Sequence, residues 1–165
     1  AMLDWSTEQR EHPVAIRVPG AVIHGEKPTK DYGILNKYET VQKGSGAAII
    51  ALGTFFGMGK QAAELIEKKT GVKPTLINPV YITGIDEELL ESLKKDHKAV
   101  VTLEDGILDG GFGEKIARFY GDSDMRTVNF GLKKEFLDRY DANEVLRQNG
   151  ITPEQIADRA AELIK

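Results

Sequence analysis

The sequence predicts an α/β protein of three layers, in which helices cover both faces of a five-stranded, mostly parallel sheet with one antiparallel strand. Strand-like and helix-like stretches alternate along most of the chain, which is typical of such folds. Two of the strand-like runs, 47–52 and 99–103, are continuously apolar, as expected of parallel strands that are covered on both faces. A third run, 38–42, alternates between apolar and polar residues and indicates an edge strand, which we expect to be the antiparallel one.

The first 35 residues differ from the rest of the chain. Residues 2–10 predict the last turns of a helix, which Pro13 ends because proline has no backbone N–H to donate. Residues 14–18 are mostly β-branched and predict a short strand. We therefore expect three parts: 1–19, the remnant of a preceding domain; 20–35, a linker interrupted by glycine and proline; and 36–165, the main domain.

The main domain shows the expected order of elements. Apolar residues recur at helical spacing in the stretches between the strands, and Gly71 and Gly150 follow two of these helices as typical end residues. Asp141 and Thr152 precede the last two helices as caps, and proline follows Thr152 at the first helical position. The predicted strands are 38–42, 47–52, 75–82, 99–103 and 127–130, and the predicted helices are 56–69, 86–95, 113–120, 141–148 and 152 onward.

Composition excludes several functional classes. The net charge of −4 gives the chain no basic surface for non-specific binding to nucleic acid or to an anionic membrane. The sequence has no cysteine, which excludes disulfides, thiolate nucleophiles and cysteine metal sites. No apolar run approaches the roughly 18 residues that a membrane span needs, and the first residues do not resemble a signal peptide. We expect a cytoplasmic protein.

The most informative stretch is 101–113, where a buried strand leads through two acids and a short loop to glycines that open a helix. Glycines at this point allow the backbone to approach its neighbours closely, and helix-terminal amides could also hold an anion. We favour the first interpretation. Because adjacent strand residues point to opposite faces, Glu104 and Asp105 are not expected to share a proton or a metal ion. We predict a structural role for Glu104, Asp105, Gly110, Gly111 and Gly113. One of the two acids should cap or hydrogen-bond the glycine-rich loop, and the other should reach a neighbouring domain or solvent.

The other motifs provide little evidence for catalysis or for ligand binding. The stretch 53–59 lies between a strand and a helix, but its glycines match neither the dinucleotide fingerprint nor the triphosphate-binding loop. His12, His24 and His97 lie far apart in the sequence and form no metal-ligand pattern, and His97 is expected at a helix end. The sequence therefore predicts no catalytic, cofactor-binding or metal-binding residue in this chain.

Several segments resemble, in the same order, the C-terminal part of the 1-deoxy-D-xylulose-5-phosphate synthases, a family of the transketolase-like superfamily. Residues 14–20 are similar to the family's A-I-R-Y-P-R-G run, and 101–113 is similar to its V-T-V-E-E/D-x-x-x-x-G-G-x-G signature. Further similar segments are 48–54, 78–86, 129–132 and 149–152. The resemblance covers nearly the whole chain.

The resemblance implies the role of the parts. Residues 1–19 would be the end of a pyrimidine-binding domain, and Arg17 would contact substrate. The parent enzyme would join pyruvate to glyceraldehyde 3-phosphate with loss of CO₂, using thiamine diphosphate and Mg²⁺ bound by two preceding domains, and would be a homodimer. This chain would pack against those catalytic domains, would hold no cofactor and would be inactive alone.

Some positions depart from the family pattern. Gly20 stands where the family has a second arginine, and Thr83, Gly84, Lys133 and Lys134 replace other family residues. These changes indicate a divergent synthase or a related enzyme with a different acceptor. The alternatives are another transketolase-like enzyme, a split subunit or a 2-oxo-acid dehydrogenase beta subunit, and, from a different class, a stand-alone interaction module.

Overall fold

The computed structural model describes residues 1–18 and 31–165, which divide into two compact units, Ala1–Leu35 and Asn36–Lys165. The first unit contains helix α1 (Met2–Glu8), which ends two residues earlier than predicted. The side chain of Gln9 then accepts the backbone N–H groups of Glu11 and His12, each at 2.9 Å, and so turns the chain. Most of the predicted linker, residues 19–30, lies outside the described residues.

The strand predicted at 14–18 is wrong, because these residues adopt no regular secondary structure. A β-strand satisfies its backbone groups through a neighbouring strand, and no described strand pairs with this segment. β-branched composition alone therefore overstated the tendency of the segment to form a strand.

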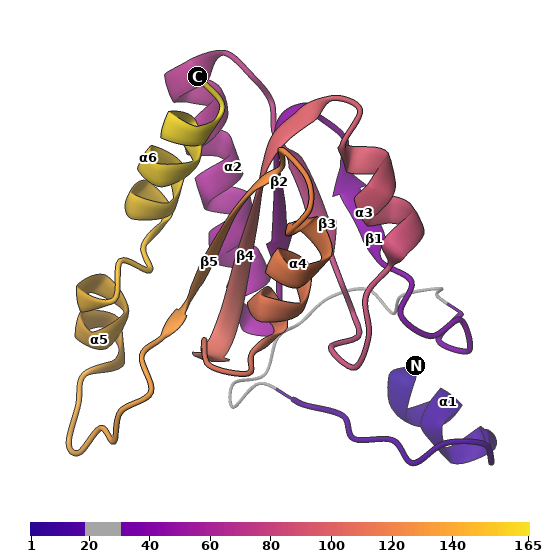
Figure 1. The fold of residues 1–165 in the computed structure, drawn as a ribbon. Coiled ribbons are helices and arrows are strands. Elements are labelled where there is room, and N and C mark those ends of the chain that lie inside the picture. Colours follow the sequence, from indigo (N-terminus) through magenta and orange to yellow (C-terminus); the bar gives the residue numbers. More distant parts are fainter. Residues whose placement is uncertain (19–30) are drawn as a thin grey trace. The chain divides into compact units, whose positions relative to one another are not determined.

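The second unit is built on a five-stranded sheet, counted over the described residues, which confirms the predicted fold class. The strands lie in the order β1-β3-β2-β4-β5, with β1 antiparallel to β3 and the other pairs parallel (Figure 1). The buried centre of β2 pairs with β4, Ile49 lying opposite Val101. The strands are β1 (Glu39–Gln42), β2 (Gly46–Ala51), β3 (Thr75–Asn78), β4 (His97–Ile107) and β5 (Arg126–Leu132).

Helices cover both faces of this sheet (Figure 1). Alternate residues of β2 and β4 point to opposite sides, so Ile49 and Val101 pack in one core cluster and Ile50 and Val100 in the other. The first cluster includes residues of α2 (Phe56–Thr70) and α6 (Pro153–Leu163), and the second includes residues of α3 (Glu87–Leu93) and α4 (Phe112–Tyr120). A 3₁₀ turn, η1 (Gly53–Phe55), precedes α2, and α5 (Ala142–Gln148) precedes α6.

The predicted ends of several helices are confirmed. Asp141 accepts the N–H of Glu144 at 2.9 Å, and Thr152 accepts that of Gln155 at 3.3 Å, so both residues cap their helices. Gly71 follows α2 with a φ of 73°, a left-handed conformation that residues other than glycine rarely adopt. No helix in the described parts of the chain is long and apolar enough to cross a lipid bilayer.

Two strand boundaries differ from the prediction. β3 ends at Asn78 instead of continuing to residue 82, because Pro79 offers no N–H and Val80 has a φ of 61° that breaks the extended conformation. β4 is longer than predicted, spanning His97–Ile107, so that Glu104 and Asp105 lie within the strand. Its last residue pairs with Leu132 of β5 beyond an irregular stretch that follows Leu103.

The strand order creates a switch point between β2 and β4. The chain leaves β2 toward β3 on one side and leaves β4 toward β5 on the other. In open α/β sheets, ligand sites and interaction sites gather at the carboxyl ends of the strands beside such a point. The loop after Glu104 and Asp105, within the stretch 101–113 that was predicted to be structural, begins at this end of the sheet.

Candidate functional site

Glu104 holds the amino-terminal end of α4. Its side chain lies inside the domain with 5 % exposure, and its two carboxylate oxygens accept the N–H groups of Phe112 at 2.8 Å and Gly113 at 3.0 Å. The N-cap residue of α4, Gly111, has no side chain to satisfy these donors. A carboxylate near the positive end of a helix dipole is favourable, so Glu104 replaces the missing cap from the neighbouring strand.

The glycines of the loop are required by close packing. A Cβ atom at Gly111 would lie 2.8 Å from the carboxyl carbon of Glu104, and one at Gly113 would lie 2.7 Å from the hydroxyl of Thr102. Neither distance leaves room for a methyl group. Gly110 has a φ of 72°, in the left-handed region. These contacts agree with tight packing of loop against helix, and the structural role of the residues stays a prediction.

Asp105 has a different partner from Glu104. Its carboxylate accepts the hydroxyl of Thr54 in η1 at 3.4 Å, which links the chain after β2 to β4 across the switch point. The backbone reinforces this link, since Leu52 N–H donates to Leu103 C=O at 2.9 Å. The two adjacent acids therefore face separate partners. Among the described residues no group of three or more histidines or acids is placed to hold a metal ion.

Arg17 lies in the first unit, in a stretch without regular secondary structure, and its side chain is exposed. Its role in substrate binding stays a prediction. His12 is also exposed in this unit, and His24 lies outside the described residues.

His97 is the first residue of β4, not the end of a helix as predicted, because α3 stops at Leu93. Its ring is buried, with Nε2 2.8 Å from the hydroxyl of Thr75 and Nδ1 3.1 Å from the carbonyl of Leu93. Nδ1 also lies 2.6 Å from the carboxylate of Asp96. Both ring nitrogens thus have partners, and the histidine joins β3, β4 and the end of α3.

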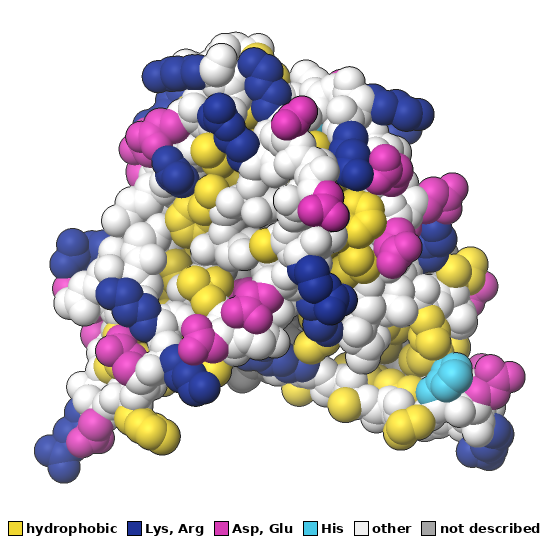
Figure 2. Space-filling view, viewed as in Figure 1, with side chains coloured by type: hydrophobic (Ala, Val, Ile, Leu, Met, Phe, Trp, Pro, Cys, Tyr) yellow, Lys and Arg dark blue, Asp and Glu magenta, His cyan; other side chains and the backbone are white. Residues whose placement is uncertain are grey.

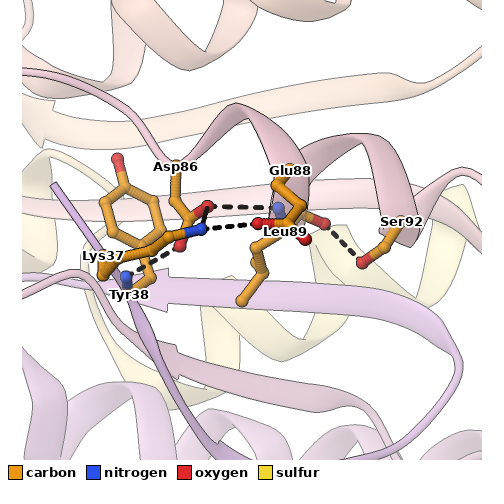
Figure 3. Close-up of polar contacts among 6 residues, drawn as sticks. All are labelled: Lys37, Tyr38, Asp86, Glu88, Leu89 and Ser92. Atoms are coloured by element: carbon orange, nitrogen blue, oxygen red, sulfur yellow. Dashed lines mark hydrogen bonds and ion pairs between the residues drawn. The ribbon is translucent and has the colours of Figure 1, made fainter.

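A polar cluster that the sequence does not reveal joins the start of the second unit to α3 (Figure 3). The buried carboxylate of Asp86 accepts the N–H of Leu89 at 3.2 Å as the cap of α3, and it accepts the N–H of Tyr38 at 3.0 Å. The ammonium group of Lys37 contacts Asp86 at 3.2 Å and the exposed Glu88 at 2.7 Å. The cap was recognisable from an acid before a helix, but the contacts with residues 37 and 38 span almost 50 positions.

Two tyrosines in the same layer are held neutral. Burial raises the pKa of the Tyr38 hydroxyl well above its ordinary value, and burial followed by the nearby Glu91 carboxylate does the same for the pKa of Tyr120. Their hydroxyls donate to the carbonyls of Gly84 at 3.3 Å and Leu90 at 2.7 Å. Both phenols therefore act as hydrogen-bond donors in the packing around α3.

Exposed apolar side chains lie in several segments at the carboxyl ends of the strands. They come after β3, at the end of β4 and after β5, and Phe136 is completely exposed. Figure 2 shows hydrophobic side chains on the loop between β5 and α5, which extends away from the sheet in Figure 1. We call this set the carboxyl-end surface; its members are Ile82, Ile107, Phe136, Leu137 and Tyr140, with exposures of 52, 41, 108, 37 and 59 %.

Sequence reasoning missed this surface, although one signal was present. The segment 133–140 places Phe136, Leu137 and Tyr140 among five charged residues, outside any periodic pattern of a helix or strand. Large apolar residues in such a loop have no reason to be buried within the domain. Isolated exposed apolar residues are common, but three within one short loop indicate a site of interaction.

Comparison with known proteins identifies relatives over most of the chain. Residues 36–156 match the family described as transketolase, C-terminal domain. The chain is 31 % identical over 156 residues to the 1-deoxy-D-xylulose-5-phosphate synthase of Shouchella clausii (strain KSM-K16), covering 92 % of this chain and 25 % of that protein. It is 32 % identical over 169 residues to the enzyme of the same name from Clostridium perfringens (strain SM101 / Type A), covering 99 % of this chain and 27 % of that protein.

Solved structures share the fold. A split-gene transketolase, described as an inactive beta4 tetramer, superimposes with a TM-score of 0.70 at 22 % identity, covering 86 % of this chain and 48 % of that one. A transketolase of Pichia stipitis in complex with sedoheptulose 7-phosphate gives a TM-score of 0.54 at 20 % identity, covering 78 % of this chain and 18 % of that one. The curated relatives confirm the resemblance to deoxyxylulose-phosphate synthases, and this chain spans about a quarter of their length.

Proposed function

Because the chain belongs to the transketolase C-terminal domain family, we propose that it is the C-terminal domain of a 1-deoxy-D-xylulose-5-phosphate synthase, and that it docks onto the catalytic domains of that enzyme without performing chemistry itself. The parent reaction would condense pyruvate with glyceraldehyde 3-phosphate and release CO₂, in the cytoplasm and in a homodimer. Support comes from relatives that carry this name and are about four times as long as the chain.

The observation that carries the docking role is the carboxyl-end surface. Its five apolar side chains face solvent, whereas the acids beside them are already engaged, Glu104 with α4 and Asp105 with Thr54. An end of a sheet that exposes several apolar side chains is suited to burial against another protein surface. Glu104 and Asp105, which are engaged within the domain, are poorly placed for proton transfer or metal binding.

Thiamine diphosphate would be held elsewhere in the parent enzyme. It needs a metal ion for its diphosphate, and the described residues offer no acidic or histidine cluster for one. We assign its binding, together with Mg²⁺, to the preceding catalytic domains. Arg17, if it contacts substrate, would do so as part of the domain that precedes residue 20.

A different acceptor substrate is the second candidate for the parent reaction. Gly20 stands where the family has an arginine that is expected to help hold the substrate phosphate. Glycine offers no cation, so a phosphorylated acceptor would lose one charge-assisted contact. Turnover of the full-length enzyme with glyceraldehyde 3-phosphate and with glyceraldehyde distinguishes the two, since an enzyme for an unphosphorylated acceptor would not favour the phosphate ester.

The docking role is tested by recombining parts of the enzyme. The catalytic domains and this chain are produced separately, and their association is measured by sedimentation velocity while product formation is followed with thiamine diphosphate and Mg²⁺ present. We expect association that the double variant Phe136→Ser, Tyr140→Ser weakens at least tenfold. The control is Val41→Ser, which removes a similarly exposed apolar side chain from β1. Equal association of both variants, or decarboxylation of pyruvate by this chain alone, would refute the proposal.

A further inference from the structure

A cavity of about 630 Å³ lies at the end of the sheet opposite the carboxyl-end surface. It is lined by the first residues of β4 and β5, the residue after α3, the turn that follows α4 and the end of α6. Figure 2 shows Lys and Arg side chains around the upper end of the molecule, where β4 and β5 begin in Figure 1. Several cationic side chains therefore line this cavity in a chain of net negative charge.

The cations of the cavity are not equivalent. Lys94 is engaged with Glu91 at 2.6 Å and lies over the ring of Phe119. Lys98 extends from β4 toward the end of α6, where its ammonium group lies 3.3 Å from the carbonyl of Ile164. The side chain of Arg126 is exposed and makes no hydrogen bond or ion pair with any residue that the structure describes.

Helix dipoles explain only part of this charge. A lysine after α3 is favourable because the carboxyl end of a helix carries partial negative charge, and Lys94 occupies such a position. Arg126 begins a strand, where no such charge requires compensation. A guanidinium group presents paired N–H donors that match the oxygens of a phosphate. Arg126 therefore supplies a group suited to an anion and unused by the fold.

Two acids face the same cavity from the turn after α4. Asp122 and Asp124 flank Ser123, whose hydroxyl donates to the carbonyl of Tyr120 at 2.8 Å and accepts the N–H of Met125 at 3.3 Å. The serine thus fixes the turn, and the carboxylates have no hydrogen bond or ion pair within the described parts of the chain. Acids beyond the carboxyl end of a helix are unfavourable for that helix, so the turn gains no stability from them.

We propose that this cavity binds a small phosphorylated polyol, with the phosphate held by Lys98 and Arg126 and the hydroxyl groups donating to Asp122 and Asp124. Carboxylates accept hydrogen bonds only, which fits sugar-like hydroxyls and disfavours a second phosphate nearby. The buried side chains of Met125 and Leu163 give the cavity an apolar wall for the carbon chain. The site goes beyond the docking role, because it lies at the other end of β4.

Calorimetric titration of the 165-residue chain with glycerol 3-phosphate at low salt tests the proposal, with inorganic phosphate and glycerol titrated separately. We expect saturable binding of glycerol 3-phosphate, at least fivefold weaker binding of phosphate, and none of glycerol. Arg126→Gln should weaken the binding of glycerol 3-phosphate and of inorganic phosphate at least tenfold. Asp124→Asn should weaken the binding of glycerol 3-phosphate and should leave the binding of inorganic phosphate unchanged or tighter. Arg139→Gln is the matched control, because it removes an exposed arginine from the loop after β5.

The opposite results would overturn the site. Absence of saturable binding, or equal binding to the Arg126→Gln and Arg139→Gln variants, would show that the basic end is only a solvated surface. Amide chemical shifts give a second measurement on the unmodified chain: the shifts caused by glycerol 3-phosphate should be confined to residues around 97–98 and 122–126. Shifts centred on the loop 104–113 would place the ligand elsewhere and refute the assignment.

Discussion

The carboxylate of Glu104 accepts the backbone N–H of Phe112 at 2.8 Å, so that a residue of β4 caps the helix that follows it. Replacement by glutamine keeps one oxygen acceptor but places an NH₂ group against a backbone donor. We expect Glu104→Gln to lower the free energy of unfolding by about 1–3 kcal/mol, as is typical when a buried donor loses a charged partner.

Urea unfolding of the chain measures this loss. Glu114→Gln is the control, because Glu114 is exposed in the first turn of the same helix and should contribute only a few tenths of a kcal/mol, a typical dipole effect at the surface. In the proposed full-length enzyme, Glu104→Gln should change stability more than turnover. A loss of turnover of about 10³ with unchanged melting would instead indicate a role in the reaction, since it equals about 4 kcal/mol of transition-state stabilisation.

Alanine substitution at two glycines of the second unit should change the stability of the chain in opposite directions. A methyl group at Gly113 would meet Thr102 and Asn129 at about 2.7 Å, so we expect Gly113→Ala to destabilise the chain by about 1–3 kcal/mol through overpacking. Gly57, in the first turn of α2, has no atom within 4 Å of the added position. Gly57→Ala should therefore stabilise by about 0.5 kcal/mol. Thermal melting of both variants checks the difference in sign.

Asp86 should be the most sensitive polar residue near the start of the domain. Asp86→Ala removes the cap of α3 and leaves the N–H of Tyr38 without its acceptor, and we expect a loss of about 2–4 kcal/mol. Glu88→Ala removes the second carboxylate that Lys37 contacts. Because Glu88 is exposed, its removal should barely change the unfolding midpoint, and equal losses for the two variants would contradict this division.

Glu144 should titrate at unusually low pH. Hydrogen bonds from Arg147 and then Gln148 lower the pKa of its carboxyl to about 2. A lowered pKa in the folded state means that this contribution to stability is present above the ordinary value of 4.5 and is lost as pH falls toward 2. Carbon NMR of the side-chain carboxyl should show the titration. Arg147→Gln should return the midpoint toward 4.5, and an unchanged midpoint would exclude the ion pair as its cause.

Deleting residues 1–30 should leave the rest of the domain folded. The unit Asn36–Lys165 contains the whole sheet and both described core layers, whereas α1 has no buried residue. We expect the melting temperature to stay within a few degrees. Unfolding of the shortened chain would show instead that the first residues belong to the core of this domain.

The sequence predicted features that depend on short-range order. The alternation of strands and helices follows from local periodicity, and the caps Asp141 and Thr152 act within one helical turn. The strand at 14–18 was predicted wrongly because pairing depends on a neighbour that local composition does not specify. The extension of β4 to Ile107 depends on β5 in the same way, through the pairing of Ile107 with Leu132.

The candidate site was predictable only in part. The acid–glycine pattern of 101–113 indicated where a strand meets a helix and that one of its two acids would cap or bond the loop, but not which of them does so. The bond between Asp105 and Thr54, and the contact of Asp86 with Tyr38, join residues about 50 positions apart. The carboxyl-end surface and the cavity exist only once strands distant in sequence are placed side by side.

Because β4 is long, charges at one end of the domain have little electrostatic effect at the other end. At roughly 3.3 Å per residue, its 11 residues carry the chain about 33 Å from the basic cavity to the carboxyl-end surface. That distance is about four times the Debye length of roughly 8 Å at physiological ionic strength. The proposed association with catalytic domains should therefore keep its rate when Arg126 is neutralised, and salt should weaken the proposed ligand binding far more steeply than docking.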